Sequence, residues 1–481
     1  MTSPRPIPLL VLACLAVAGC YRHPPPVDGG PRDAQVPDTS DAGEPLDASD
    51  ASDATDADGT DDAGALECEE DADCDADPCT TARCDAGVCV ADPIDDATTC
   101  DDGDVCTRAD VCAAGTCVGT RVSCAVCDAT DGAFLTTFRA AWHKGPRAYV
   151  AMPDGGHAVT GFGDGDAWLG AIDRAGAITI DRGYGHASMG DRGFAIARPS
   201  TTPGEVLVGG YSQVGGGPAL AWMVRVDARD GDERGARALW DDRNGSVHGI
   251  LLQPDGSTIL LATSGARATI VRIAADGTLG PERSYFDVGW AYGLAGIVEM
   301  PGGDLVFAGD AGAFPDRKVR VVRVRATGEV VWDRVLDAQG ALDLVAQGDG
   351  SVIVGGQSWS GDGTGGAWLT RIDAAGGTRW ERFYGEDPNA SIASIAMTAE
   401  GLLLAASTND DAWLIRTDRD GVLLDETTLA LGGYESATIV RADGAGFVVS
   451  GTSRVGEGAD APIHAWILRA DSFDDLACPA D

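Results

Sequence analysis

The sequence lacks the short motifs that mark common enzyme classes. Its 481 residues contain no Gly-x-Ser-x-Gly segment, no Gly-x-x-x-x-Gly-Lys phosphate loop and no His-Glu-x-x-His pair. Lysine occurs twice, at Lys144 and Lys318, and neither follows a glycine-rich run. Histidine is sparse and has no metal-ligand spacing; its six positions are His23, His143, His157, His186, His248 and His464. We therefore predict no catalytic residue, no metal and no cofactor.

Positive charge is scarce throughout the chain. Lys and Arg total 35 against 75 Asp and Glu, which gives a formal net charge of −40. The segment 21–127 holds 27 acidic and 5 basic residues, and so carries 22 of these 40 negative charges. A strongly acidic chain repels polyanions, so we expect no nucleic-acid partner.

Helical periodicity is also missing between Tyr149 and Arg469, where one hexapeptide recurs instead. Its clearest copy is Trp368–Asp373, and two degraded copies lack the Trp. The copies begin 45 to 54 residues apart, which is typical of a repeat architecture. The other copies are Trp168–Asp173, Trp222–Asp227, Thr269–Ala274, Arg320–Arg325, Trp413–Asp418 and Trp466–Asp471.

Each repeat contains four short runs separated by Gly/Asp turns. In the fifth copy the runs are 341–346, 351–356, 368–372 and 378–384. Four such runs predict an antiparallel meander, and seven meanders predict an all-β, seven-bladed β-propeller over residues 128–481. The small residues of the first two runs are expected near the axis. Five of the copies end in an aspartate that is expected to cap its turn: Asp173, Asp227, Asp373, Asp418 and Asp471. We expect the repeated tryptophans to pack between neighbouring blades; they are Trp168, Trp222, Trp368, Trp413 and Trp466.

The repeat resembles the bacterial β-propeller repeats of exported proteins. The resemblance covers about residues 145–471 and rests on units of the form Asp-Ala-Trp-Leu-x-Arg-x-Asp-x-x-Gly. It is clearest at 411–414 and 366–369. The resemblance implies the propeller fold and export from the cytoplasm.

The N-terminus has the pattern of a targeting segment, residues 1–19. Its apolar run, Ile7–Val17, is too short to span a membrane as a helix. Leu15-Ala-Val-Ala-Gly-Cys20 resembles a bacterial lipobox, which implies lipid attachment at Cys20. The alternative is an ordinary secretory signal followed by a chance cysteine. Tyr21, rather than Asp, follows the lipid site, which favours the outer membrane of a Gram-negative envelope.

Two different segments follow the predicted lipid site. Residues 20–66 contain almost no apolar side chain larger than Ala, so we predict a disordered acidic tether. Residues 67–127 form a cysteine-rich module of two copies that resembles the short Cys-Thr-x-x-x-Cys repeats of extracellular stalks. The alternative is a zinc site. Only Cys124 and Cys127 have the close spacing that zinc ligands need, and the module contains no His. We instead expect disulfides among twelve cysteines: Cys68, Cys74, Cys79, Cys84, Cys89, Cys100, Cys106, Cys112, Cys117, Cys124, Cys127 and Cys478.

The last repeat lacks its fourth run. The segment 132–140 precedes the first repeat and reads like the outer run of the sixth. We predict that it pairs beside 464–470 and completes the seventh blade, because an unfilled edge would leave backbone groups unpaired. This closure would also bring Cys478 within reach of Cys127 or Cys124.

These features favour a lipid-anchored, exported, non-catalytic binding or scaffold protein. Its partner would be a protein or a glycan, and it would contact the membrane through the lipid on Cys20. The competing interpretation is an exported enzyme, either quinone-dependent or a hydrolase, with its site in the central funnel. Acidic turns at Asp164–Asp166 and Asp410–Asp411 are compatible with calcium or with simple solvation. We expect His157 and His248 to be packing residues.

Overall fold

The computed structural model shows strands throughout the part of the chain that it describes. The predicted signal segment, Cys20 and the tether lie outside this part. Among the described residues, no helix is long and apolar enough to cross a membrane. The described residues are 68, 74, 79–100, 107–121, 133–185, 190–213, 217–288, 293–312, 316–359, 365–385, 387–408, 411–429, 431, 434–454, 461–473 and 476.

Residues 133–473 form seven four-stranded antiparallel sheets, the blades of a β-propeller. Blade 1 consists of β6 (Lys144–Ala151), β7 (His157–Gly163), β8 (Asp166–Ile172) and β9 (Ile178–Tyr184). Blade 2 consists of β10 (Arg192–Ala197), β11 (Glu205–Gln213), β12 (Ala219–Asp227) and β13 (Glu233–Ala238). Blade 3 consists of β14 (Gly245–Leu252), β15 (Thr258–Ser264), β16 (Arg267–Ile273) and β17 (Leu279–Asp287). Blade 4 consists of β18 (Leu294–Glu299), β19 (Leu305–Ala311), β20 (Lys318–Val324) and β21 (Val330–Leu336).

The last three blades continue this order, and the seventh takes one strand from the start of the domain. Blade 5 consists of β22 (Gly340–Ala346), β23 (Val352–Trp359), β24 (Gly365–Ile372) and β25 (Thr378–Tyr384). Blade 6 consists of β26 (Ser391–Met397), β27 (Leu402–Ser407), β28 (Ala412–Thr417) and β29 (Leu423–Leu429). Blade 7 consists of β30 (Tyr434–Asp443), β31 (Gly446–Arg454), β32 (Ile463–Ala470) and β5 (Phe134–Phe138).

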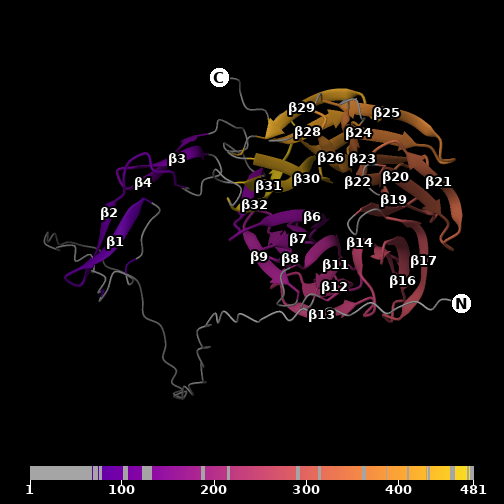
Figure 1. Ribbon diagram of the computed structural model, residues 1–481, viewed down its shortest axis with the longest axis horizontal. Helices are drawn as coiled ribbons and strands as arrows, with labels where there is room; N and C mark the ends of the chain where they lie inside the picture. Colours follow the sequence, from indigo (N-terminus) through magenta and orange to yellow (C-terminus); the bar gives the residue numbers. More distant parts are fainter. Residues whose placement is uncertain are drawn as a thin grey trace, which may run out of the picture. The chain divides into compact units, whose positions relative to one another are not determined.

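The first strands of the seven blades form a closed inner ring. Each touches the first strand of the next blade, and β30 touches β6. Figure 1 shows the blades following one another from magenta to yellow, with β31 and β32 next to β6. We call the face where the first strands begin the entry face, and the opposite one the exit face. The predicted seven-bladed, all-β propeller is therefore confirmed.

Blade 7 closes as expected. Strand β5 pairs antiparallel with β32, from Ala465 opposite Phe138 to Arg469 opposite Phe134. Phe138 is fully buried and packs edge-on against Trp168 of blade 1, with ring centroids 5.1 Å apart. The predicted pairing is confirmed, with slightly narrower limits. The predicted bond of Cys478 lies outside the described residues.

Every inner strand has a β-bulge at the same place. In each blade, the pairing of the first strand with the second skips one residue of the first. A bulge bends the strand and redirects the skipped side chain. The skipped residues are Arg147, Phe194, His248, Ala295, Leu342, Ala393 and Thr438.

Paired glycines in the second strands accommodate this geometry. A Cβ at Gly210 would lie 1.7 Å from the carbonyl oxygen of Arg192 in its own blade's first strand. A Cβ at Gly209 would lie 2.7 Å from Cγ1 of Val247 in the next blade. One glycine is therefore required by the bulged strand, and its neighbour by crowding between blades.

The cysteine-rich segment forms two hairpins, β1 (Thr80–Asp85) with β2 (Val88–Pro93) and β3 (Thr107–Ala113) with β4 (Thr116–Arg121). One disulfide, Cys79–Cys112, joins the first hairpin to the second. The expected disulfides are confirmed for eight of the twelve cysteines; the other bonds are Cys68–Cys84, Cys74–Cys89 and Cys100–Cys117. Cys106, Cys124, Cys127 and Cys478 lie outside the described residues, as does the alternative zinc pair.

Candidate functional site

The repeated tryptophans lie between blades rather than at the surface. Trp368, for example, is fully buried against Val306 and Val319 of blade 4, and its Nε1 donates to Glu381 at 2.6 Å. Little ring surface is left for a ligand to stack on. The relative exposures of the set are Trp168 1%, Trp222 3%, Trp368 0%, Trp413 6% and Trp466 1%.

In the two hexapeptide copies that lack the Trp, other side chains occupy its position. Arg320 stands where Trp would be in blade 4, and its guanidinium pairs with Asp333 and lies 5.2 Å from the ring centroid of Phe286. In blade 3, Thr269 shares a hydrogen bond with Ser284. Phenylalanine side chains supply the aromatic bulk here, since Phe286 stacks with Phe307 at a centroid distance of 6.1 Å.

The aspartates that end the hexapeptides cap their turns. One carboxylate oxygen of Asp373 accepts the amides of Ala375 and Gly377, at 2.9 and 2.8 Å. Asp173 and Asp418 bind two amides of their own turns in the same way. These carboxylates therefore hold the turn between the third and fourth strands.

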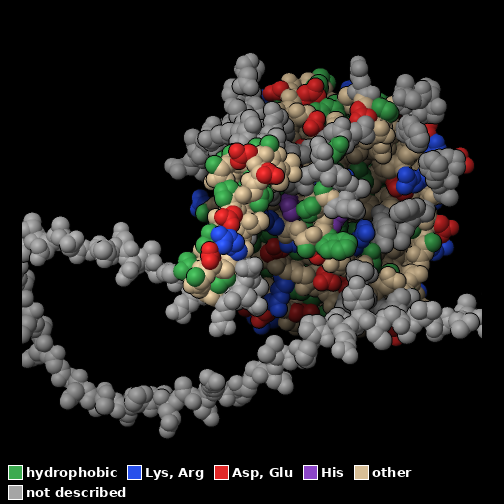
Figure 2. All heavy atoms as spheres, turned by 60° about the vertical axis from the view of Figure 1, so that its left-hand side comes forward, with side chains coloured by type: hydrophobic (Ala, Val, Ile, Leu, Met, Phe, Trp, Pro, Cys, Tyr) green, Lys and Arg blue, Asp and Glu red, His purple; other side chains and the backbone are tan. Residues whose placement is uncertain are grey.

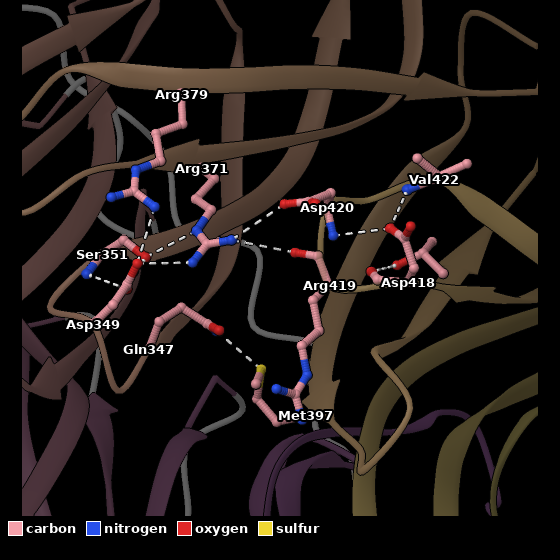
Figure 3. Close-up of polar contacts among 11 residues, drawn as sticks. Gln347, Asp349, Ser351, Arg371, Arg379, Met397, Asp418, Arg419, Asp420 and Val422 are labelled. Atoms are coloured by element: carbon pink, nitrogen blue, oxygen red, sulfur yellow. Dashed lines mark hydrogen bonds and ion pairs between the residues drawn. The ribbon is translucent and has the colours of Figure 1, made fainter.

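The arginine of the hexapeptide joins two blades on the exit face (Figure 3). Arg371 Nη2 donates to Asp349 at 3.0 Å, and Nε donates to Ser351 at 2.9 Å. Its Nη1 reaches the carbonyl oxygen of Arg419 in blade 6, at 3.4 Å. Hydrogen bonds from Ser351, assisted by Arg371 and Arg379, lower the pKa of Asp349 to about 2.

The same connection recurs in blade 4. Arg323 Nε donates to Asp304 at 2.9 Å, and its Nη1 donates to the carbonyl oxygen of Ala374 in blade 5 at 3.1 Å. Sequence reasoning missed this role. The available signal was an acidic residue in the turn after the first run, such as Asp304, Asp349 or Asp443, recurring with the hexapeptide arginine. We interpret these arginines as structural.

The buried histidines have side-chain partners within the protein. Nδ1 of His157 lies 2.7 Å from the hydroxyl of Tyr149. Nε2 of His248 lies 2.6 Å from Ser246 Oγ, and its ring stacks on Phe194 at 4.8 Å. The serine–histidine pair resembles a nucleophile with its base. Ser246 is only 2% exposed, however, so a substrate cannot reach its hydroxyl.

A polar network links the inner strands of three adjacent blades. Ser394 Oγ donates to Asp343 Oδ2 at 3.0 Å, and Arg441 Nη1 donates to Ser394 Oγ at 2.5 Å. Arg441 also lies 3.5 Å from Asp343. The inner strands thus carry charged side chains in addition to the small residues that the sequence predicts near the axis. The acid and the base neutralise each other, so this network is internally satisfied.

The acidic turn before the first hexapeptide has a structural partner. Asp164 adopts a positive φ of 51° and accepts the backbone amides of Trp142 at 2.8 Å and His143 at 3.1 Å. These contacts fix the segment that leads from β5 into β6. Asp410 of the other candidate calcium turn lies outside the described residues.

Cationic and aromatic side chains gather near the start of β6 on the entry face. They surround the ring of Phe162, whose centroid lies 4.9 Å from the ring of His143, 5.9 Å from Arg147 and 5.3 Å from Arg192 of blade 2. We call His143, Arg147, Phe162 and Arg192 the basic–aromatic cluster. Figure 2 shows His, basic and hydrophobic side chains lying close together near the middle of the propeller surface in view.

Blade 7 extends this cluster with a second cation–aromatic pair. Arg454 lies 5.9 Å from the ring centroid of Tyr434, and its positive charge acts on His143. Trp142, next to His143 in the chain, is 81% exposed, and Tyr434 is 57% exposed. Exposed Trp, Tyr and Arg are the residue types that dominate binding energy at protein interfaces.

The pKa shifts in the cluster differ in direction from those of arginines that form ion pairs. Burial and the neighbouring Arg192 lower the pKa of Arg147. Burial, Arg192 and Arg454 also lower the pKa of His143, so its imidazole is neutral at pH 7. In contrast, hydrogen bonds to carboxylates raise the pKa of Arg182 and Arg320. Among the described residues, no carboxylate forms an ion pair with Arg147.

Comparisons with known proteins support no family assignment. No protein-family model and no curated protein matches the chain. Among solved structures it is similar to BamB from Moraxella catarrhalis, with 11% identity and a TM-score of 0.42 over 69% of this chain and 98% of that one. It is also similar to the extracellular domain of a protein named as a one-component system from B. thetaiotaomicron, with 12% identity and a TM-score of 0.42 over 68% and 39% of the two chains.

Proposed function

We propose that this protein is a lipid-anchored, exported binding or scaffold protein that presents its propeller to a protein or glycan partner. The proposal depends mainly on the composition of the entry face at blades 1, 2 and 7. There, Trp142 and Tyr434 are exposed, Arg454 lies over the ring of Tyr434, and Arg147, over the ring of Phe162, forms no ion pair with a described carboxylate. A solvent-exposed aromatic surface next to unpaired positive charge is typical of a contact surface.

The rest of the chain fits presentation of this surface away from a membrane. In the proposed organisation, residues 1–19 are removed, 20–66 form a lipidated tether, 67–127 form the disulfide module and 128–481 form the propeller. The disulfides of the module match an oxidising compartment outside the cytoplasm. We place the protein in the cell envelope, at the outer membrane, facing the periplasm or the exterior.

Partner capture on matched variants tests the proposed function. The purified chain would be incubated with envelope extract and its bound components quantified by mass spectrometry. We expect a component that wild type and Phe383→Ala retain and that Trp142→Ala loses. Phe383 is a suitable control because it is 53% exposed on the outer strand of blade 5. If every retained component binds both variants alike, the entry face is not the contact surface.

A further inference from the structure

We propose that reduction of the cysteine-rich module converts two pairs of adjacent disulfides into two zinc sites, each with four thiolates. This inference goes beyond the proposed function, because it concerns the module and not the entry face of the propeller. The sequence predicts no metal from the spacing of its His residues. The grouping of these cysteines is a property of the tertiary structure.

Two disulfides lie side by side at the first hairpin. The Sγ atoms of Cys68, Cys74 and Cys89 all lie within 4.8 Å of one another. Cys84 is bonded to Cys68 and stands directly opposite Cys89 in the pairing of β1 with β2. The bonds Cys68–Cys84 and Cys74–Cys89 therefore gather four sulfur atoms in one place. We call these four residues the first sulfur cluster.

The second hairpin has the same arrangement. The Sγ atoms of Cys79, Cys100 and Cys117 also lie within 4.8 Å of one another. Cys112 is bonded to Cys79 and stands opposite Cys117 in the pairing of β3 with β4. We call these four residues the second sulfur cluster. Because the grouping occurs in both sequence copies of the module, it follows from the fold of the unit and not from one chance approach.

The positions of the sulfur atoms suit a tetrahedral zinc ion. Zn–S bonds of about 2.3 Å place the thiolates of such a site about 3.8 Å apart. Sulfur atoms of the two neighbouring disulfides already lie within 4.8 Å of one another, so they need to move by only about 1 Å. Bonded sulfur atoms separate when their S–S bond opens. Four thiolates select Zn²⁺ over Ca²⁺ and Mg²⁺, which prefer oxygen ligands.

The module depends on its cross-links because it has almost no apolar core. Among the side chains of residues 68–121 whose burial the structure describes, the buried ones are Cys68, Cys79 and Cys112. Small domains of this kind are stabilised either by disulfides or by a structural metal. Zinc in the second sulfur cluster would join the first hairpin to the second, as the bond Cys79–Cys112 does in the oxidised protein.

The conversion requires an external dithiol as reductant. Each disulfide accepts two electrons and two protons from a dithiol and yields two thiols, while the dithiol becomes a disulfide. Four thiols then release four protons as they bind Zn²⁺, so the affinity for zinc increases as the pH rises. Each cluster has half-buried members that a reductant can reach; they are Cys74 and Cys89 in the first, and Cys100 and Cys117 in the second.

Cobalt binding to the full chain tests the inference, because Co²⁺ in a tetrahedral thiolate site absorbs visible light. The chain would be reduced with dithiothreitol, separated from it without oxygen, and titrated with Co²⁺ and then with Zn²⁺. We expect the bands of tetrahedral cobalt thiolate, which Zn²⁺ abolishes. Cys74→Ser/Cys89→Ser and Cys100→Ser/Cys117→Ser should each bind one metal ion fewer per chain than wild type. Cys478→Ser removes a thiol outside both clusters and should bind the wild-type amount.

Proteolysis distinguishes a folded metal site from binding by an unfolded chain. In the reduced wild type, Zn²⁺ should slow cleavage within residues 68–127 about tenfold or more, because a ligand of the folded state stabilises that state. The protection should be weaker in each double variant. In the oxidised chain, Zn²⁺ should leave the cleavage rate unchanged.

Three outcomes would overturn the inference. These are the absence of a tetrahedral cobalt complex in the reduced wild type, undiminished metal binding by both double variants, and no protection of residues 68–127 by Zn²⁺. Equal cobalt binding by the oxidised chain would also contradict it, since the ligands would then not be thiolates. None of these results bears on the capture experiment, which depends on the propeller.

Discussion

Arginine residues of this protein serve two distinct purposes at the scale of single side chains. The hexapeptide arginines, such as Arg371 and Arg323, are bound on the exit face by an acid of their own blade and a carbonyl of the next. Arg147 is instead bound near the entry face by an aromatic ring. The first group holds blades together, whereas Arg147 forms no ion pair with a carboxylate of the described residues.

Asp310 gives the propeller a pH-dependent stability. Burial raises its pKa to about 6, although the amide of Ala341 and the guanidinium of Arg317 partly oppose this shift. The folded state therefore binds a proton more tightly than the unfolded state, and stability falls as the pH rises from about 4 to about 6. Asp310→Asn should remove this dependence and increase the free energy of unfolding at pH 7 by up to about 3 kcal/mol. Urea unfolding at acidic and neutral pH measures the effect.

Asp349 provides a control with the opposite sign. Its pKa is lowered to about 2, chiefly by hydrogen bonds from Ser351. Its contribution to stability is therefore present above the ordinary pKa of aspartate and is lost as the pH falls toward about 2. Asp349→Asn should destabilise the protein at neutral pH. An increase in stability at pH 7 for both variants alike would contradict the assignment.

Cys20 is predicted to attach the protein to a membrane. Cys20→Ser should abolish lipid modification. Without attached acyl groups to insert into the bilayer, the protein should move from the membrane fraction to the soluble envelope fraction. Fractionation followed by immunoblotting measures the change, with Cys14→Ser as the matched control. If the Cys20→Ser variant still requires detergent for release from the membrane fraction, the predicted lipid attachment at Cys20 is wrong.

At the scale of elements, closure of the ring depends on one short strand from the N-terminal side. Strand β5 is five residues long and supplies the outer edge of blade 7. Its last residue, Phe138, also reaches the packing layer between blades 7 and 1. A strand that joins the two ends of the domain opposes separation of the first and last blades.

Removal of the Phe138 ring from β5 should lower the stability of the propeller. Phe138→Ala removes a fully buried ring that packs on Trp168, so we expect a loss of about 3–5 kcal/mol in the free energy of unfolding. Phe383→Ala removes a ring that is 53% exposed and should cost less than about 1 kcal/mol. Chemical denaturation of both variants gives the comparison. Similar small losses would mean that β5 is not needed for closure.

At the scale of the whole molecule, disulfides stabilise the cysteine-rich hairpins, whereas burial of apolar side chains stabilises the propeller. Among the side chains whose burial the structure describes, the hairpins β1–β2 and β3–β4 have few that are large and buried. The disulfide Cys79–Cys112 joins the two hairpins across 33 residues. A disulfide of this loop length stabilises by about 3–4 kcal/mol on chain entropy alone. The propeller instead buries apolar side chains in every interface between blades.

Limited proteolysis should therefore show two successive steps of cleavage. We expect the first cuts within residues 28–66, where the sequence predicts a disordered tether. Reduction should next expose 68–127 while the propeller stays resistant. Thiol counting on the unreduced, denatured protein should find none of the twelve cysteines of the disulfide set free. A majority of free thiols, or propeller cleavage before that of 28–66, would contradict this order.

The sequence by itself determined the repeating architecture. Blade number, strands per blade and the role of the final Asp all follow from patterns within about 50 residues, because strand alternation and turn chemistry are local properties. The missing outer run of the last repeat also indicated that 132–140 would complete blade 7. The tertiary structure alone decided which side chains meet on the entry face. His143 and Arg454 are far apart in the chain and approach only when the ring closes, and the bulges determine where Arg147 lies. No local pattern encodes such a contact, since it depends on the angles between all seven blades.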